Sequence, residues 1–513
     1  MMIRSFVTVS SGTLASRLLG FVRDSMVAAL LGAGPVADAF LVAFQLVNVV
    51  RRLLTEGALN AALVPAWLRL REAEGAAAAA AFAGRLLGTV SAALVTATAL
   101  LALVMPLVIM ALAPGFAGRE ALAMAVDDAR LMLPYLAFAG PVTVLMAIMN
   151  AQGRYALIAF SPLLFNIALI SVMAVLLLWR QDAARAALIL AAVVGIAGLL
   201  QLSILILRRG ENAASPLRVS FDKEMRGFAA KAVPGMIASS GPQLMMVAAA
   251  IIASSSPSAV SWLYFANRLI ELPLGLVGVA MGTVLVKELS RAVQSGDAAA
   301  VSHAESRALE LAAGLALPAT LGLIVLAEPI VRLLFEHGAF TAVDTASTAR
   351  VLMWLSLGLP AQVLFKALAP AFFARENTAT PLIAVLKGIL LALATAFLFG
   401  HFFGAQGIAA GIALGAWGSA LGLIREGATR FGFAIDAAAR RRLPRIVAAA
   451  AVMGAALWLV PIARLDGLAQ AAAIIGVIAA GVVLYGLLLQ LFGITGWREA
   501  VNALRSAPRD LRG

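Results

Sequence analysis

The sequence has 513 residues, of which 62% are hydrophobic and 13% are charged, and its mean hydropathy is +0.98. Soluble domains are roughly 45–50% apolar and about 25% charged, so this composition excludes a soluble protein and predicts a polytopic membrane protein. The lack of cysteine excludes disulfides and thiolate metal sites, and the net charge of +13 fits basic cytoplasmic loops better than nucleic-acid binding.

Long apolar segments recur along the whole chain and predict an all-α protein with fourteen membrane-spanning helices. A span needs about 20 mostly apolar residues, which fits the length of each segment. We expect the first to be a retained helix and not a signal peptide, because Arg17 and Arg23 interrupt it. The segments lie at residues 5–31, 38–67, 84–112, 129–151, 157–179, 185–207, 229–253, 259–286, 308–327, 346–373, 380–402, 405–424, 444–463 and 468–492.

The connections between these segments predict the orientation and the division of the chain. Most of the 39 lysines and arginines fall in alternate connections and near the two ends, which predicts that both termini are cytoplasmic. The polar connection after the sixth span separates two six-helix lobes. We therefore expect an N-terminal lobe at 1–208, a cytoplasmic linker at 209–228, a C-terminal lobe at 229–424, a basic cytoplasmic linker at 425–443, two added helices at 444–492 and a cytoplasmic tail at 493–513.

The first two spans contain charges inside otherwise apolar runs. In the first, Arg17 and Asp24 are seven residues apart and share a helix face, so they can pair, while Arg23 projects away from them. A charge at bilayer depth costs at least about 2.5–3.5 kcal/mol, so these residues are expected to face a water-filled cavity. The alternative is that the arginines lie near the membrane edge and extend to the headgroups.

The second and eighth spans repeat this pattern. Asp38 begins the second span and can cap it. Arg52 can pair with Glu56, whereas Arg51 has no acidic residue one turn away. In the eighth span Arg268 and Glu271 are three residues apart and can pair, in a cavity or as a structural ion pair.

Arginines exceed acids in these spans, with Arg23 and Arg51 left over after the local pairs are removed. A surplus of guanidinium groups predicts a cavity that binds an anion, because arginine matches phosphate oxygens two at a time. A cavity for organic cations would instead hold unpaired acids.

Several stretches together resemble the MurJ/MviN family of lipid II flippases. Two of them are Ser16–Asp24 (SRLLGFVRD) and Tyr264–Pro273 (YFANRLIELP), and the second span adds the DAF run from Asp38 and the NVVRRLLTE run from Asn48. Shorter similar stretches are Ala113–Phe116, Gly338–Thr345 and Leu368–Phe373. The resemblance runs over essentially the whole chain in order.

The resemblance implies a bacterial inner-membrane protein of the multidrug/oligosaccharidyl-lipid/polysaccharide exporter superfamily. Its two six-helix lobes would enclose a central cationic cavity, and the helices at 444–492 would form a groove for the lipid tail. The cavity arginines would be Arg17, Arg23, Arg51 and Arg268, with Asp24, Asp38 and Glu271 beside them. Some relatives have an acid where Asn267 stands, so the role of this position is open.

The implied activity is transport of the undecaprenyl-pyrophosphate-linked peptidoglycan precursor from the inner to the outer leaflet by alternating access, which requires no enzymatic reaction and no cofactor. A coupling ion such as sodium stays unassigned. Expected partners are lipid II, membrane lipids and proteins of cell-wall synthesis and division. The alternatives are a flippase for another polyprenyl-linked oligosaccharide, a drug or ion antiporter of the same superfamily, and a non-transporting scaffold.

Overall fold

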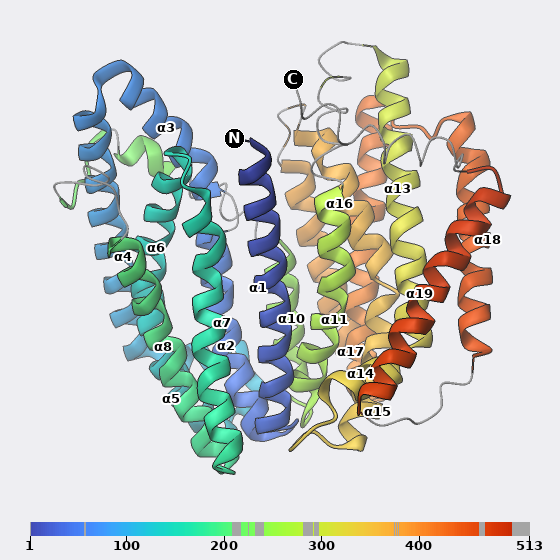
Figure 1. Ribbon diagram of the computed structural model, residues 1–513, viewed down its shortest axis with the longest axis horizontal. Helices are drawn as coiled ribbons and strands as arrows, with labels where there is room; N and C mark the ends of the chain where they lie inside the picture. The colour runs from blue at the N-terminus through green and yellow to red at the C-terminus, as the bar shows by residue number, and fades with distance from the viewer. Residues whose placement is uncertain are drawn as a thin grey trace. The chain divides into compact units, whose positions relative to one another are not determined.

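The structure is a computed structural model that describes residues 2–55, 58–207, 217–223, 225–230, 241–280, 291, 297–373, 375, 377, 379–460 and 467–494. Within these ranges every regular element is a helix (Figure 1). The chain divides into two compact units, the first made of Met1–Ser261 with His337–Thr341 and the second of Trp262–Glu336 with Ala342–Gly513.

Unit 1 is a bundle of long helices joined by short connections. Its elements are α1 (Met2–Leu31), α2 (Pro35–Thr55), α3 (Ala58–Glu74), α4 (Ala76–Leu112), the 3₁₀ helix η1 (Pro114–Phe116), α5 (Glu120–Met132), α6 (Pro134–Ala151), α7 (Tyr155–Leu178), α8 (Ala183–Leu207) and α10 (Gly241–Ala253). Helix α1 packs mainly along α7, and α2 packs mainly along α5. The first of these pairings brings Arg23 of α1 next to Asn166 of α7.

Unit 2 contains the remaining helices. They are α11 (Ala259–Ala280), of which the first three residues belong to unit 1, α13 (Ala298–Val325), α14 (Ala327–Phe335), α15 (Ala342–Ser356), α16 (Leu359–Phe373), α17 (Ala379–Phe431), α18 (Ala437–Trp458) and α19 (Gly467–Leu491). Helices α13 and α18 pack side by side, and α19 packs on α18. The two helices predicted as an addition therefore attach to this unit through α13.

The structure confirms an all-helical membrane protein but not the count of fourteen spans. Eight of its described helical stretches are long and apolar enough to cross a membrane. The predicted span 38–67 covers α2 and α3, with residues 56 and 57 outside the described part, and the predicted span 346–373 is divided into α15 and α16 by a turn at Leu357 and Gly358. The alanine-rich residues 76–83 continue α4 as a helix. Residues 231–240 and 281–286 of the predicted seventh and eighth spans lie outside the described part of the chain.

The predicted spans 380–402 and 405–424 form the two arms of α17. The arms meet at Gly404, whose φ of 56° and ψ of −137° are not helical, so the chain turns back there. Glycines at every fourth position of the second arm, Gly407, Gly411 and Gly415, leave no room for a Cβ against the first arm. Close backbone approach at such small-residue stripes is how membrane helices pack without large side chains.

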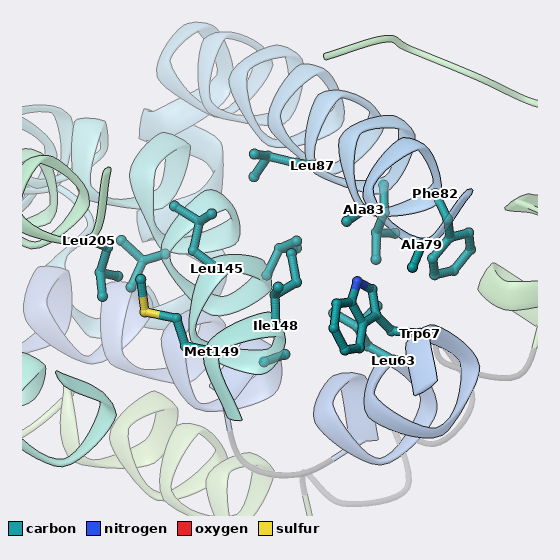
Figure 2. Close-up of a cluster of buried hydrophobic side chains, with 14 of the residues drawn as sticks. Leu63, Trp67, Ala79, Phe82, Ala83, Leu87, Leu145, Ile148, Met149 and Leu205 are labelled. Atoms are coloured by element: carbon teal, nitrogen blue, oxygen red, sulfur yellow. The ribbon is translucent and has the colours of Figure 1, made fainter. Parts of the chain in front are cut away.

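A core of buried side chains connects α3 to the rest of unit 1 (Figure 2). Leu63 and Trp67 of α3 are almost fully buried against Phe82 of α4. Side chains of α6 and α8, among them Ile148 and Leu205, complete the cluster. Because burying each large apolar side chain stabilises the fold by about 1.5–3 kcal/mol, this cluster fixes α3 firmly on the bundle.

The compact units divide the chain later than the predicted linker 209–228. Helix α10 follows that linker, yet it packs against α2, α4 and η1 and so belongs to unit 1. One contact of this kind joins η1 to the end of α10, where the backbone N–H of Gly115 donates to Ser254 Oγ at 3.0 Å. The predicted lobes, linkers and tail stay predictions, and residues 208–216 and 495–513 lie outside the described part.

Candidate functional site

Arg23 and Asp24 of α1 form a buried ion pair. Their exposed fractions are 7% and 1%, and both Nε and Nη2 of Arg23 donate to Asp24 Oδ1, at 2.9 and 2.6 Å. The prediction that Asp24 pairs with Arg17 was therefore wrong. Arg23 is the partner because its long side chain bends back toward the adjacent carboxylate, whereas Arg17 lies two turns away and is exposed.

Helices α2 and α7 supply the surroundings of this ion pair. Nη1 of Arg23 donates to Asn166 Oδ1 at 3.1 Å, and Asn166 Nδ2 donates to the backbone oxygen of Ser16 at 3.2 Å. The guanidinium carbon of Arg23 also lies 5.1 Å from the ring centre of Phe44 and 5.8 Å from that of Phe165. Cation–π contact in a desolvated setting is worth about 2 kcal/mol, so these rings help to hold the charge inside the bundle.

Arg51 of α2 approaches the same aromatic ring. Its guanidinium carbon lies 5.9 Å from the ring centre of Phe165, and its Nη2 donates to Asn48 Oδ1 at 3.1 Å. Arg51 is half-buried. The ring of Phe165 is thus a contact shared by two arginines from different helices, and it brings the predicted residues Arg23 and Arg51 together.

The other predicted residues of α1 and α2 have different outcomes. Arg17 is exposed and makes no ion pair with a residue in the described part of the chain. Arg52 is half-buried, and the proposed partner Glu56 lies outside the described residues, so this pair stays a prediction. On α1 the positive charge left over after the Arg23–Asp24 pair therefore belongs to Arg17, not to Arg23.

The sequence suggested that Asp38 caps its own helix, but the structure shows that it does not. Helix α2 begins at Pro35, and the buried carboxylate of Asp38 accepts hydrogen bonds from the backbone N–H of Ser261, at 2.8 Å, and from the Ser261 hydroxyl. Ser261 is the third residue of α11. Asp38 therefore satisfies the otherwise unpaired N–H groups at the start of α11, and its negative charge complements the positive end of that helix dipole.

A second contact in unit 1 joins the segment 337–341 to the end of α1. The backbone N–H of Ala339 donates to the oxygen of Ala29 at 2.8 Å. Gly338 has a φ of +59°, and a Cβ there would overlap the oxygen of Ala29; a Cβ on Gly32 would lie 2.7 Å from the oxygen of Ala339. Only glycine permits this approach, because it tolerates positive φ and has no side chain.

Unit 2 contributes the predicted pair of α11. Nη1 of Arg268 donates to Glu271 Oε2 at 2.8 Å, and the two side chains are 21% and 27% exposed. The pairing three residues apart is as predicted. Convergence of Arg268 with the arginines of α1 and α2 on one central cavity stays a prediction.

Sequence reasoning missed the aromatic residues of this site. Phe44 and Phe165 read as ordinary apolar residues of membrane helices, and no spacing in the sequence links them to Arg23. The polar residue Asn166 inside an apolar helix was the one usable signal, and it does form the hydrogen bond between helices that such residues commonly form.

Chemically, this part of unit 1 concentrates guanidinium groups in an apolar helix bundle. Arg23, Arg51 and Asp24 together carry one net positive charge, with the exposed Arg17 on the same helix as Arg23. Guanidinium forks bind carboxylate and phosphate oxygens, so the residues suit recognition of an anion and do not form a nucleophile, base and orienting group of the kind used in covalent catalysis.

Known proteins were compared with the chain. A family profile described as lipid II flippase MurJ matches residues 27–492. The chain belongs to this family. It is 37% identical over 509 residues to a probable lipid II flippase MurJ of Rhizobium meliloti (strain 1021), a match that covers 96% of this chain and 94% of the relative. It is also 33% identical over 425 residues to the lipid II flippase MurJ of Burkholderia cenocepacia (strain J2315), covering 80% of this chain and 81% of the relative.

Solved structures show the same fold. A lipid II flippase MurJ in an inward closed conformation superposes with a TM-score of 0.80 at 22% identity, covering 96% of this chain and all of that one. An inward-facing multidrug resistance MATE family transporter of the MOP superfamily gives a TM-score of 0.67 at 16% identity, covering 86% of this chain and 98% of that one. As a MurJ-family member, the chain is a multi-pass membrane transporter and not a catalyst of a chemical reaction.

Proposed function

We propose that this chain is a lipid II flippase that moves the undecaprenyl-pyrophosphate-linked peptidoglycan precursor from the inner to the outer leaflet by alternating access. Membership of the MurJ family supports the activity and the substrate. The observation that carries the mechanism is the pair of arginines on α1 and α2, Arg23 and Arg51, which share the ring of Phe165 inside apolar helices. A positive charge inside apolar membrane helices is costly unless an anion binds to it.

The arginines differ in how accessible they are to a substrate headgroup. Arg23 already holds the carboxylate of Asp24, so a pyrophosphate competes with Asp24 for it. The exposed Arg17 is more readily offered to the substrate. We infer that Arg17 makes the first contact with the headgroup and that Arg23 positions Arg51 through the ring of Phe165, which both arginines contact.

The setting of this function is also part of the proposal. The basic connections favour a bacterial inner membrane location with both termini in the cytoplasm. The exposed apolar side chains along α18 and α19 suit a groove for the polyprenyl tail. A coupling ion such as sodium, and partner proteins of cell-wall synthesis and division, remain predictions of the resemblance.

Arginine substitutions test the site. In cells depleted of their own flippase, Arg17→Ala, Arg51→Ala and Arg268→Ala are expected to prevent growth and to lower the exposure of lipid II in the outer leaflet tenfold or more. The reason is that a hydrogen bond to a charged group is worth about 1.5–3 kcal/mol. Lysine at each position is expected to retain part of the activity, because it keeps the charge but loses the fork.

The matched control is Arg185→Ala, because Arg185 is an exposed arginine at the start of α8. It is expected to support growth normally. Immunoblots of membrane fractions must show equal amounts of every variant. Full activity of all three alanine variants at normal abundance would reject the site. If the distribution of lipid II between the leaflets did not change when the protein is depleted, the function would be rejected.

A further inference from the structure

One segment of unit 1 has a surface that the flippase proposal does not use. Residues 217–223 follow the connection after α8 and lie along the N-terminal part of α4, without helical structure up to Asp222. The backbone N–H of Arg218 donates to the oxygen of Gly84 at 3.4 Å, and the backbone N–H of Ser220 donates to Thr89 Oγ1 at 3.0 Å. The hydroxyl of Thr89 in turn donates to the oxygen of Ser220 at 3.2 Å.

These bonds show the direction of the segment. Two extended residues cover about 7 Å, and five helical residues, from 84 to 89, cover about 7.5 Å, so the segment descends along α4 in parallel with the helix axis. Gly88 makes this approach possible, because a Cβ there would lie 2.5 Å from the oxygen of Arg218. Ser220 therefore lies beside Thr89, in the first half of α4, and Asp222 returns to the level of Arg85.

The level of Thr89 in the membrane follows from the length of α4. The helix has 37 residues and is about 55 Å long, well beyond the roughly 30 Å of hydrocarbon in a bilayer. Its strongly exposed apolar side chains begin at Val95 and continue through Leu100, Leu103 and Leu107. Thr89 is one to two turns before Val95, which places the segment in the headgroup layer of the leaflet that contains the N-terminal end of α4.

The apolar side chains of this segment face outward. Leu217, Val219 and Phe221 are 60%, 54% and 73% exposed, and they alternate with Arg218, Ser220 and Asp222. The Ser220 hydroxyl accepts from the backbone N–H of Asp222 at 3.3 Å, which forms a turn around Phe221, so the three exposed apolar side chains make a stripe that follows the chain from Leu217 into this turn. In a loop that faced only water, burying the apolar face and exposing the polar one would be the favoured arrangement.

Contacts with α4 and with the core of unit 1 hold the segment with these apolar side chains exposed. Asp222 lies 3.5 Å from Arg85 of α4, and its Oδ1 accepts from the backbone N–H of Met225 at 2.8 Å. Met225 is buried, and the ring of Phe228 packs edge-on against Phe82 with centroids 6.1 Å apart. The residues after the stripe are thus anchored in the core of unit 1, which fixes the stripe on the outside.

The charges around the stripe match an anionic surface. Arg218, Lys223 and Arg226 are exposed beside it, and the stretch 217–231 contains four basic and two acidic residues. Basic residues near a membrane surface gain about 1 kcal/mol each from anionic lipids. Apolar side chains flanked by such residues are typical of segments that lie in the interface without crossing the membrane.

We propose that residues 217–223 are an interfacial membrane anchor, in which Leu217, Val219 and Phe221 insert at the headgroup and acyl-chain boundary while Arg218, Lys223 and Arg226 contact anionic glycerophospholipid headgroups. The anchor fixes the depth of unit 1 in the membrane beside α4. This role is independent of which lipid-linked substrate the protein transports.

Spin-label accessibility tests the proposal directly, because the chain contains no cysteine and single substitutions can be labelled cleanly. Val219→Cys and Phe221→Cys are labelled in the full-length protein, reconstituted in vesicles of phosphatidylethanolamine and phosphatidylglycerol. Collision with oxygen, which concentrates in lipid, is compared with collision with a water-soluble nickel chelate. The matched control is Glu74→Cys, an exposed position at the end of α3.

Labels at 219 and 221 are expected to show a several-fold higher ratio of oxygen to nickel collisions than the label at 74. In vesicles of phosphatidylcholine alone this ratio should fall, because the anionic headgroups are missing. Ratios at 219 and 221 equal to that at 74 would overturn the anchor. Shielding in native membranes but not in the lipid vesicles would overturn it in favour of a protein partner, and a ratio unchanged in phosphatidylcholine would overturn the role of the basic residues.

Discussion

Arg23 carries a full charge at 7% exposure because three kinds of contact replace its water. The carboxylate of Asp24 supplies the opposite charge, the amide of Asn166 accepts a further hydrogen bond, and two phenylalanine rings offer their negative faces. Removing one member of such a set leaves the others buried without compensation. Breaking a buried ion pair from one side costs about 3–5 kcal/mol, more than the pair contributes relative to apolar residues.

Asp24→Asn is therefore expected to destabilise the protein by about 3 kcal/mol, seen as a lower midpoint of thermal unfolding in detergent. The double variant Arg23→Met with Asp24→Asn should recover much of this loss, because no buried charge remains. Asp182→Asn, at an exposed position before α8, serves as the control and should change little. A double variant as unstable as the single one would show that the ion pair is not the cause.

At the scale of elements, unit 1 is held together at places where backbones touch. The first turn of α11 is capped by Asp38 from α2, and the segment 337–341 is hydrogen-bonded to the end of α1. Both contacts depend on small local features, a single carboxylate in one case and the paired glycines Gly32 and Gly338 in the other.

Gly338→Ala is expected to loosen the second contact. The left-handed backbone costs a non-glycine residue about 1–2 kcal/mol, and the added Cβ meets the oxygen of Ala29. The thermal midpoint should fall and the 337–341 segment should become accessible to protease. Gly34→Ala is the control, because no atom lies within 4 Å of the Cβ it would add. Equal midpoints for the two variants would contradict this account.

For the whole molecule, the predicted orientation is open to a direct measurement. Ala117, after η1, and Glu72, near the end of α3, are both exposed and lie at opposite ends of α4. Ala117→Cys is expected to react with a membrane-impermeant maleimide in intact cells, whereas Glu72→Cys should react only after the inner membrane is permeabilised. Labelling of Glu72→Cys in intact cells would reverse the assigned orientation.

The sequence by itself determined the class of protein, the positions of most apolar helices and the residues whose charges needed an explanation. These features follow from composition and from local spacing, such as the pair Arg268 and Glu271, three residues apart on one helix. An apolar helix can be predicted from its own residues, because a helix in lipid forms its backbone hydrogen bonds within the segment. The division of 346–373 into α15 and α16 shows where apolar length alone was not sufficient.

Only the tertiary structure decided which charges meet. Asp24 pairs with Arg23 and not with Arg17, Asp38 caps α11 in place of α2, and Phe165 of α7 joins arginines of α1 and α2. The reason is physical: a long guanidinium side chain can reach several partners, and which one it finds depends on the helix packed beside it. That packing is set by contacts between residues far apart in the chain, and these contacts cannot be predicted from the spacing of residues within one helix.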